Sequence, residues 1–402
     1  MKIQCRLVTA LSAMTLLFVA ATTEAGTWRV ELDGSGDFTV LQDAVDAAAE
    51  GDTVLVGAGQ FDTIRPVPDW DGFSATMAIQ KGGLVVEGQG AGSTIIGANY
   101  IGTHYRSIVV NSWATGNGFT LRHATVIGGY NGLHYQKDQL LVENCEFTGS
   151  THGIATFATR GAIIRNCSFH DMEGVGLGTA DVDDGSWDIV VEDSDFARLE
   201  VGFSATATSN AVIRRCRIVE CIGGVDINLY SSAEISDCEI IGIPDQEHGV
   251  AITVSLFSEA EISHCTLDMS MAQPYRALRV SNWSDISGTG NTIRCGGYTS
   301  MFTNMHFDAS DFTGNEIYKA DRFCLEATHF NENLYEPPLH LDMTDNYWGT
   351  SDPDSIAAWI DDHYDHHPQD AQHRVIVDFL PYLEDPVPVE PTSLGDVRGL
   401  FR

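Results

Sequence analysis

The chain has 402 residues and is strongly acidic: 56 Asp and Glu stand against 22 Lys and Arg, which gives a formal net charge of −34. Such a charge repels nucleic acid and anionic membranes, and no basic stripe offsets it, so both are excluded as partners. An acidic polysaccharide would also be repelled unless cations such as Ca²⁺ bridged the two surfaces.

The first 25 residues are predicted to be a signal peptide. Lys2 and Arg6 form a positive start, an apolar run covers 11–21, and a cleavage site follows at 23–25. That run is too short to span a bilayer, and no later segment reaches the roughly 20 apolar residues needed. We therefore expect a protein with no transmembrane segment after signal removal, either secreted or held at the cell surface, with the periplasm as an alternative.

A capping helix is predicted at 38–50. Thr39 and Gln42 have capping-box spacing, Gly51 is a stop signal, and a strand follows at 53–56. The apolar face of this helix comprises Leu41, Ala44, Val45 and Ala48. Such a helix would cover the open strand edge of the structure that follows it.

An internal repeat dominates the middle of the chain. One column of small residues recurs at spacings of 22, 27, 22, 22 and 27 residues: Cys145, Cys167, Ser194, Cys216, Cys238 and Cys265. Asn291, Asn315 and Asn346 are later members of the same column. Units of this length with several short strands and no helical periodicity predict a solenoid of stacked coils.

The residue before each column member is predicted to form a corner. These residues are Asn144, Asn166, Asp193, Arg215, Asp237 and His264. Asn and Asp tolerate the left-handed backbone conformation best after glycine, and one such residue bends the chain between two strands. The alternation of apolar residues therefore slips by one position at each corner, as it does at Asn166.

The cysteines of the column are predicted to form a buried ladder of free thiols. Equivalent residues on stacked coils lie roughly 4.8 Å apart, which is too far for the Cβ separation of a disulfide. Short Cys-x-x-Cys spacings typical of zinc sites are absent from the column. Disulfide pairing remains the alternative, with Cys221, Cys295 and Cys324 as candidates outside the column.

Each coil also contains a strand led by glycine, and its alternation predicts which side chains face outward. The expected inward row is Leu133, Ile154, Leu177, Phe203, Val225, Val250 and Leu278. The expected outward row is His134, Ala155, Gly178, Ser204, Asp226, Ala251 and Arg279. A second outward row is expected at Gln136, Phe157, Ala180, Thr206, Asn228, Thr253 and Ser281. This face is mostly small and neutral, so Asp226 is its one carboxylate.

The C-terminal part is predicted to close the solenoid. Residues 346–383 contain a turn, a short acidic helix and a strand, and form the expected cap of a single domain over 26–383. The Pro-spaced segment 384–402 is expected to be a linker and tail, which is either a flexible end or a sorting or anchoring signal.

These features resemble the right-handed parallel β-helix (pectin lyase-like) repeat proteins of secreted bacterial type, over residues 27–383. The resemblance rests on the "DGSGDF" turn and "AVDAA" helix at the start, and on "NYWG" before the acidic helix near the end. It implies an all-β, single-stranded right-handed parallel β-helix of about 22-residue coils. The start is similar to that of pectinesterases, but their catalytic motifs are absent, so no catalytic residue carries over.

The resemblance also implies where chemistry would lie. Enzymes of this group use carboxylates on the outer face of one sheet, with Ca²⁺ or water and a nearby Arg or Lys. Asp226 and Arg279 are therefore the predicted catalytic residues, roughly 10 Å apart across two coils. In a lyase, Ca²⁺ would neutralise a uronate carboxylate and Arg279 would remove the α-proton. Asn228 and His134 on the same face are predicted to bind substrate.

The inserted loop at 178–188 is the predicted Ca²⁺ site. Asp181, Asp183 and Asp184 would supply oxygen ligands, although a solvated acidic turn is the alternative. Trp187 is either a sugar-stacking platform, and so a substrate-binding residue, or an aromatic packed over the base of the loop.

The predicted function is binding of extracellular polysaccharide, with cleavage by a lyase or glycoside hydrolase mechanism if the protein is an enzyme. One alternative is a non-catalytic surface or structural β-helix protein. A further alternative is metal handling through the histidine cluster at 361–373, because imidazole and carboxylate both bind divalent transition metals. The partner is expected to be a cell-surface or soluble glycan, and the protein a monomer.

Overall fold

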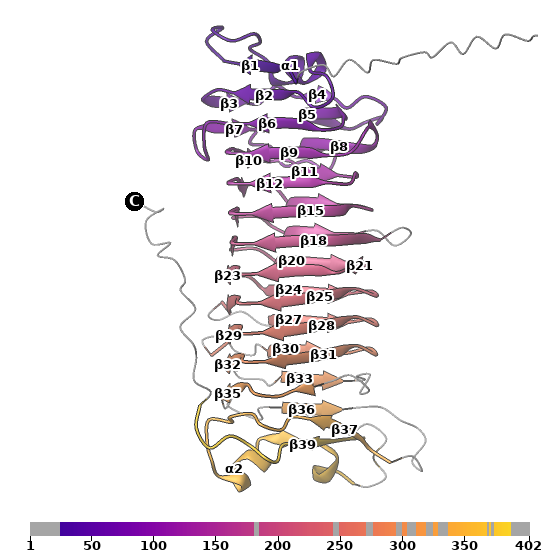
Figure 1. The fold of residues 1–402 in the computed structure, drawn as a ribbon, viewed down its shortest axis with the longest axis vertical. Coiled ribbons are helices and arrows are strands. Elements are labelled where there is room, and N and C mark those ends of the chain that lie inside the picture. The colour runs from indigo at the N-terminus through magenta and orange to yellow at the C-terminus, as the bar shows by residue number, and fades with distance from the viewer. Residues whose placement is uncertain are drawn as a thin grey trace, which may run out of the picture.

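The strands of the protein form three long sheets, A, B and C, that run along an elongated column from the N-terminal to the C-terminal end (Figure 1). The computed structural model describes residues 25–180, 185–243, 249–270, 276–294, 300–303, 311–318, 325–328, 337–367, 370 and 374–386. Strand pairing is parallel throughout these residues, except where β4 pairs antiparallel with β5.

Sheet A consists of β1 (Thr27–Val30), β2 (Thr53–Val56), β6 (Leu84–Glu87), β9 (Phe119–Arg122), β12 (Leu140–Glu143), β15 (Arg160–Arg165), β18 (Ser186–Glu192), β21 (Thr208–Ser209), β22 (Ala211–Arg214), β25 (Ser232–Ser236), β28 (Glu259–Ser263), β31 (Asp285–Thr289), β34 (Asp311–Phe312), β37 (Leu339–Asp342) and β39 (Val375–Asp378). Sheet B consists of β3 (Gly59–Phe61), β7 (Thr94–Ile96), β10 (Thr125–Ile127), β13 (Glu146–Thr148), β16 (Ser168–His170), β19 (Asp195–Ala197), β23 (Arg217–Val219), β26 (Glu239–Ile241), β29 (Thr266–Asp268), β32 (Thr292–Arg294) and β35 (Glu316–Tyr318). Sheet C consists of β4 (Arg65–Pro66), β5 (Ser74–Lys81), β8 (Tyr105–Thr115), β11 (Asn131–Tyr135), β14 (His152–Thr156), β17 (Val175–Thr179), β20 (Val201–Thr206), β24 (Gly223–Asn228), β27 (Val250–Ser255), β30 (Arg276–Val280), β33 (Ser300–Thr303), β36 (Leu325–Thr328) and β38 (Ile360–Asp361).

Each coil passes from sheet A round a sharp corner to sheet B, then to sheet C, and then back to sheet A. The corner between A and B is a single residue with φ between 51° and 54° at all six predicted positions: Asn144, Asn166, Asp193, Arg215, Asp237 and His264. The prediction of a left-handed corner is therefore confirmed. The corner also explains why the alternation of inward and outward side chains slips by one position, because the corner residue belongs to neither strand.

The cysteine ladder is confirmed as a row of free, buried thiols. Cys145, Cys167, Cys216, Cys238 and Cys265 are all at most 3% exposed. Burial raises the pKa of the Cys167 thiol to about 12, so it stays protonated. Cys221 lies outside the column and is also free, whereas Cys295 and Cys324 lie outside the described residues.

The same column continues as an asparagine ladder. Cys265 N donates to Asn291 Oδ1 at 2.8 Å, Asn291 Nδ2 to Asn315 Oδ1 at 2.9 Å, and Asn315 Nδ2 to Asn346 Oδ1 at 3.1 Å. All three Asn side chains are at most 1% exposed. The interior therefore changes from small apolar groups to a hydrogen-bonded amide stack towards the C-terminal end.

The N-terminal cap contains α1 (Leu41–Ala47), but the predicted capping box is wrong. The N-cap residue is Val40, and no side chain caps the helix. Gln42 instead accepts a hydrogen bond from Ala78 N at 2.7 Å and donates to Ala78 O at 3.0 Å. Its amide thus docks the helix onto the backbone of β5.

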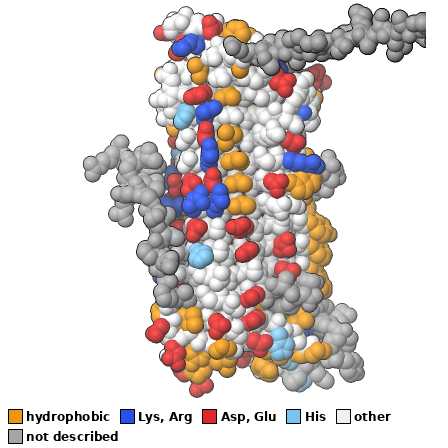
Figure 2. All heavy atoms as spheres, viewed as in Figure 1, with side chains coloured by type: hydrophobic (Ala, Val, Ile, Leu, Met, Phe, Trp, Pro, Cys, Tyr) orange, Lys and Arg blue, Asp and Glu red, His pale blue; other side chains and the backbone are white. Residues whose placement is uncertain are grey.

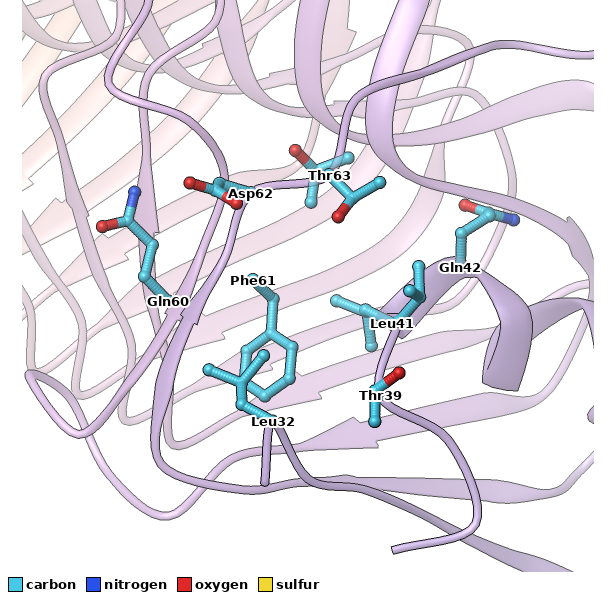
Figure 3. A pocket seen from close by; sticks show the side chains of 10 residues that line it. Leu32, Thr39, Leu41, Gln42, Gln60, Phe61, Asp62 and Thr63 are labelled. Carbon is cyan, nitrogen blue, oxygen red and sulfur yellow. The ribbon is translucent and has the colours of Figure 1, made fainter. Parts of the chain in front are cut away.

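A cavity of about 40 Å³ lies between this helix and the segment around β3; Leu41 and Phe61 are among its lining residues (Figure 3). That volume has room for little more than ordered water. At the opposite end, α2 (Pro353–Ala357) and a 3₁₀ turn, η1 (His363–Asp365), lie in the C-terminal cap near β39, and Trp348 is fully buried. Among the described residues, no helix is long and apolar enough to cross a bilayer.

Candidate functional site

Three consecutive turns from sheet C to sheet A each present an aromatic side chain to solvent. The turns have related sequences, "NLYSS" at 228–232, "SLFSE" at 255–259 and "SNWSD" at 281–285. Tyr230, Phe257 and Trp283 are 66%, 51% and 51% exposed. We name these three residues the aromatic ridge. Figure 2 shows hydrophobic side chains gathered along the margin of the molecule where β24, β27 and β30 turn towards sheet A.

The backbone of these turns is in an unfavourable conformation for such side chains. Each turn holds two successive residues at positive φ: Leu229 and Tyr230 at 54° and 59°, Leu256 and Phe257 at 58° and 62°, Asn282 and Trp283 at 58° and 62°. Residues held at positive φ are normally Gly, Asn or Asp. A bulky residue held there costs on the order of 1–3 kcal/mol, and such strain concentrates at functional positions.

A ladder of buried hydroxyl groups fixes the turns from behind. Thr208 N donates to Ser231 Oγ at 3.0 Å, Ser231 N to Ser258 Oγ at 3.1 Å, and Ser258 N to Ser284 Oγ at 3.1 Å. All four hydroxyl residues are at most 3% exposed. Each rung joins one turn to the next, so the aromatic residues are held at the spacing of the coils.

The rings of the ridge are ordered relative to each other. Tyr230 and Phe257 are nearly parallel, with ring centroids 5.2 Å apart and an interplanar angle of 9°. Their backbones are also linked, since Tyr230 N donates to Leu256 O at 2.9 Å and Phe257 N to Asn282 O at 3.0 Å. The exposed rings thus form a continuous apolar strip rather than scattered surface residues.

A shallow acidic groove of about 420 Å³ borders the ridge on sheet A. Its floor comes from β22, β25, β28 and β31, and its carboxylates stack in register, Glu234 beside Glu261 and Glu259 beside Asp285. None of its lining residues is Lys or Arg. The groove therefore offers hydrogen-bond acceptors and repels anions.

The outer face of sheet C lies on the other side of the ridge and holds the predicted catalytic residues. In register across neighbouring strands are Ser204, Asp226, Thr253 and Arg279. Asn228 Nδ2 donates to Asp226 at 3.1 Å, and Thr206 Oγ1 donates to Asn228 at 3.2 Å. Burial raises the pKa of Asp226, while the Asn228 hydrogen bond and the charge of Arg279 act in the opposite direction.

The predicted register of β27 is wrong by two residues. Asp226 lies beside Thr253, not Ala251, and the inward residue is Ile252, not Val250. The prediction followed Gly249, but the glycine row continues as Ala251 and Ala277, which are fully buried. An alanine is small enough to take a place that glycine fills in earlier coils.

The structure places the other predicted binding residues apart from Asp226. Trp187 lies at the start of β18, two coils before Tyr230, with the Arg160 guanidinium 4.6 Å from its ring. His134 is 5% exposed and lies 5.0 Å from Trp70 and 4.8 Å from Phe157, measured between ring centroids. Burial lowers the pKa of His134 to about 4, and the positive charge of Arg106 adds to this.

The predicted Ca²⁺ ligands Asp181, Asp183 and Asp184 lie outside the described residues. Within the part of the chain that is described, no group of three or more His, Cys, Asp or Glu side chains is arranged to hold a metal ion. In the histidine cluster, His366 Nε2 contacts Asp361 Oδ1 at 2.6 Å, and residues 371–373 lie outside the described residues.

The ridge is the element that sequence reasoning missed. Its signal was present as an aromatic residue followed by serine in three successive coils, at 230–231, 257–258 and 283–284. It was overlooked because the prediction followed the alternation within strands, and the ridge lies in the turns between them.

Comparison with known proteins agrees with this architecture. Residues 107–293 match the family model described as the right handed beta helix region. The fold of the chain is a right-handed parallel β-helix. No curated protein matches it.

Several solved structures are similar to this chain, among them polysaccharide lyases, hydrolases and an adhesin. The surface adhesin PfbA of Streptococcus pneumoniae has a TM-score of 0.48 and 12% identity, covering 74% of this chain and 91% of its own. The PL6 family polysaccharide lyase Pedsa3628 from Pseudopedobacter saltans has a TM-score of 0.46 and 10% identity, covering 91% and 94%. An alginate lyase from Paenibacillus sp. str. FPU-7 has a TM-score of 0.42 and 12% identity, covering 72% and 98%. At these identities the likeness concerns the fold.

Proposed function

We propose that the protein binds extracellular polysaccharide along the aromatic ridge and the acidic groove beside it. The observation that carries this proposal is the ridge itself. Its three aromatic side chains are each more than half exposed and occupy strained turns on consecutive coils. Aromatic rings offer an apolar face to the C–H groups of a sugar ring, and a polar neighbour accepts its hydroxyl hydrogens. A narrow row of aromatic rings that extends over three consecutive coils suits a chain-like ligand.

The charge of the site selects the kind of glycan. The groove carries Glu234, Glu259, Glu261 and Asp285 with no basic residue among its lining residues, and the whole chain carries −34. A polyanion would be repelled from such a surface at moderate ionic strength. We therefore assign the ridge to neutral polysaccharides, whose hydroxyl groups donate to the carboxylates.

Binding is better supported than hydrolysis. Glycoside hydrolysis uses two carboxyl groups about 5–9.5 Å apart. In the sheet C row from His134 to Arg279, Asp226 is the single carboxylate, so it lacks a partner within that row. Lyase chemistry at Asp226 and Arg279 is a separate candidate function on the face of sheet C, and it requires a uronate-containing glycan rather than the neutral polymers assigned to the ridge. It is supported by the buried Asp226 carboxyl, because a raised pKa is a common feature of catalytic acids and bases.

The test is binding of the purified protein to soluble galactomannan, xylan and mixed-linkage β-glucan, measured by affinity gel electrophoresis. We expect retardation by at least one polymer, and its loss when all three ridge residues are changed to Ala. Tyr364→Ala is the matched control, because Tyr364 is 76% exposed and lies at the C-terminal cap. Failure of the wild type to bind any of the polymers, or equal loss in the control, would reject the proposal.

Catalysis is tested separately by following unsaturated products and reducing ends with and without Ca²⁺. Product that disappears in Asp226→Asn and Arg279→Met would establish the lyase candidate. Binding without product would leave a non-catalytic binding protein.

A further inference from the structure

A short loop covers the outer face of sheet C near its N-terminal end. β4 pairs antiparallel with β5, and the connecting residues 67–73 place Trp70 and Phe73 over the sheet. The two rings stack with centroids 4.0 Å apart. They pack on a small apolar patch comprising Val67, Ala75, Ala78 and Val109. This cover is separate from the aromatic ridge, which lies several coils further along the column.

Arg106 lies buried beneath this cover. It is 7% exposed, and its guanidinium carbon is 5.9, 5.3 and 4.9 Å from the ring centroids of Trp70, Phe73 and Tyr130. Its Nη1 donates to Thr103 O at 2.8 Å and to Tyr105 O at 3.1 Å. Its buried Nε has no acceptor among the described residues, and none of their carboxylates forms an ion pair with it.

Two further polar side chains lie on the same face. Asn111 is 2% exposed, and both its side-chain oxygen and nitrogen are buried without a partner among the residues that the structure describes. His134 approaches Trp70, and its Nδ1 lies 3.2 Å from Asn131 Nδ2. Trp113 is 43% exposed and lies edge-on to Trp70, with ring centroids 6.2 Å apart. Trp113 therefore lies at the solvent-exposed side of this group of residues.

A buried cation without a counter-charge is costly, and so is a buried amide without hydrogen bonds. The cost of the buried cation disappears if a ligand supplies a negative charge and acceptor oxygens. The edge of a guanidinium formed by Nε and the neighbouring Nη2 matches the two oxygens of a carboxylate. Aromatic faces around the guanidinium exclude water and strengthen that interaction.

We propose that Arg106, under Trp70 and Phe73, binds a small carboxylate. The loop at 67–73 is the cover that moves to admit it. Only two residue pairs, Arg65 with Ala75 and Pro66 with Ser74, hold its first strand to β5. Asp69 and Gly72 take positive φ within the loop, which gives it two tight bends between these anchors.

The experiment titrates the purified protein with sodium acetate, sodium galacturonate, galactose and sodium chloride, and follows tryptophan fluorescence and thermal unfolding. We expect a saturable change with both carboxylates and none with galactose or chloride. Binding of galacturonate at least tenfold tighter than acetate would show that the carboxylate belongs to a sugar acid, whereas equal binding would identify free carboxylates. No saturable response to either carboxylate, or an equal response to galactose, would overturn the proposal.

Variants locate the site. Arg106→Met is expected to abolish the response, and Arg160→Met, which also removes an arginine next to a tryptophan, is expected to keep it. If Arg106→Met fails to fold, Arg106→Lys is the deciding variant. It keeps the positive charge but loses the pair of guanidinium N–H groups that bonds both carboxylate oxygens, so carboxylate binding should weaken at least tenfold. Tyr230→Ala should retain full carboxylate binding, which separates this site from the ridge. Undiminished binding by both Arg106→Met and Arg106→Lys would contradict the assignment.

Discussion

Replacing Tyr230 by Ala gives the sharpest test of the ridge, because this residue is the most exposed of the three and contributes least to the core. A Tyr side chain has about 150–250 Å² to bury. Since 66% of Tyr230 is exposed, a sugar ring that covered one face would remove about 60 Å² from water. At about 25 cal/mol per Å² this is about 1.5 kcal/mol, or roughly a tenfold rise in Kd.

The measurement is the Kd for whichever neutral polymer the wild type binds, by affinity electrophoresis at several polymer concentrations. Thermal unfolding is recorded in parallel, and we expect the free energy of unfolding to fall by about 1–2 kcal/mol because only a third of the side chain is buried. Tyr364→Ala should leave the Kd unchanged. A Tyr230→Ala protein that binds as well as the wild type while Phe257→Ala and Trp283→Ala also bind normally would refute the reasoning.

Further predictions concern the interior and the pH dependence of stability. Asn315→Leu breaks the buried amide stack at its centre and removes the hydrogen bonds that Asn315 makes with Gly288 O and Asn291 Nδ2. We therefore expect the free energy of unfolding, measured by urea denaturation, to fall by about 3–5 kcal/mol. Asn117→Leu, at an exposed asparagine, should change it little. The folded-state pKa of His134, about 4, lies below its unfolded value of about 6.5, so its contribution of about 3 kcal/mol is present above pH 6.5 and is lost as pH falls towards 4. His134→Gln should flatten that part of the stability profile measured by thermal unfolding between pH 4 and 7; an unchanged slope would contradict the assignment.

The fold could be read from the sequence because each coil repeats the same local requirement. An Asn or Asp at a left-handed corner and a small residue immediately after it identify the coil without tertiary information, as Asn166 and Cys167 show. Registers were harder to predict. The glycine row ends at Gly224, and Ala251 replaces it, so a pattern based on glycine alone moved β27 by two residues.

The candidate sites depend on features that strand periodicity does not report. Tyr230, Phe257 and Trp283 lie in turns, where alternation has no meaning, and only the coil-to-coil spacing reveals that they are neighbours. The cover over Arg106 is still less predictable, because residues 67–73 belong to no repeat. His134 was predicted to face a substrate from the correct side of sheet C, but the cover that buries it comes from another part of the chain.

Removal of one whole coil tests the ridge and the neighbouring face of sheet C in a single variant. Deleting 231–257 joins Tyr230 to Ser258 and removes β25, β26 and β27, while the coils on either side can stack because contacts in a solenoid are between neighbours. The registers then place Asp226 directly beside Arg279, about 4.8 Å away, so the pKa of Asp226 should fall. The ridge would keep Tyr230 and Trp283, so glycan binding should weaken as in Phe257→Ala. Deleting 159–185, which joins Ala158 to Ser186, removes a coil of equal length away from the ridge and should leave binding intact. A shortened protein that folds and still binds glycan like the wild type would show that Phe257 has no part in binding.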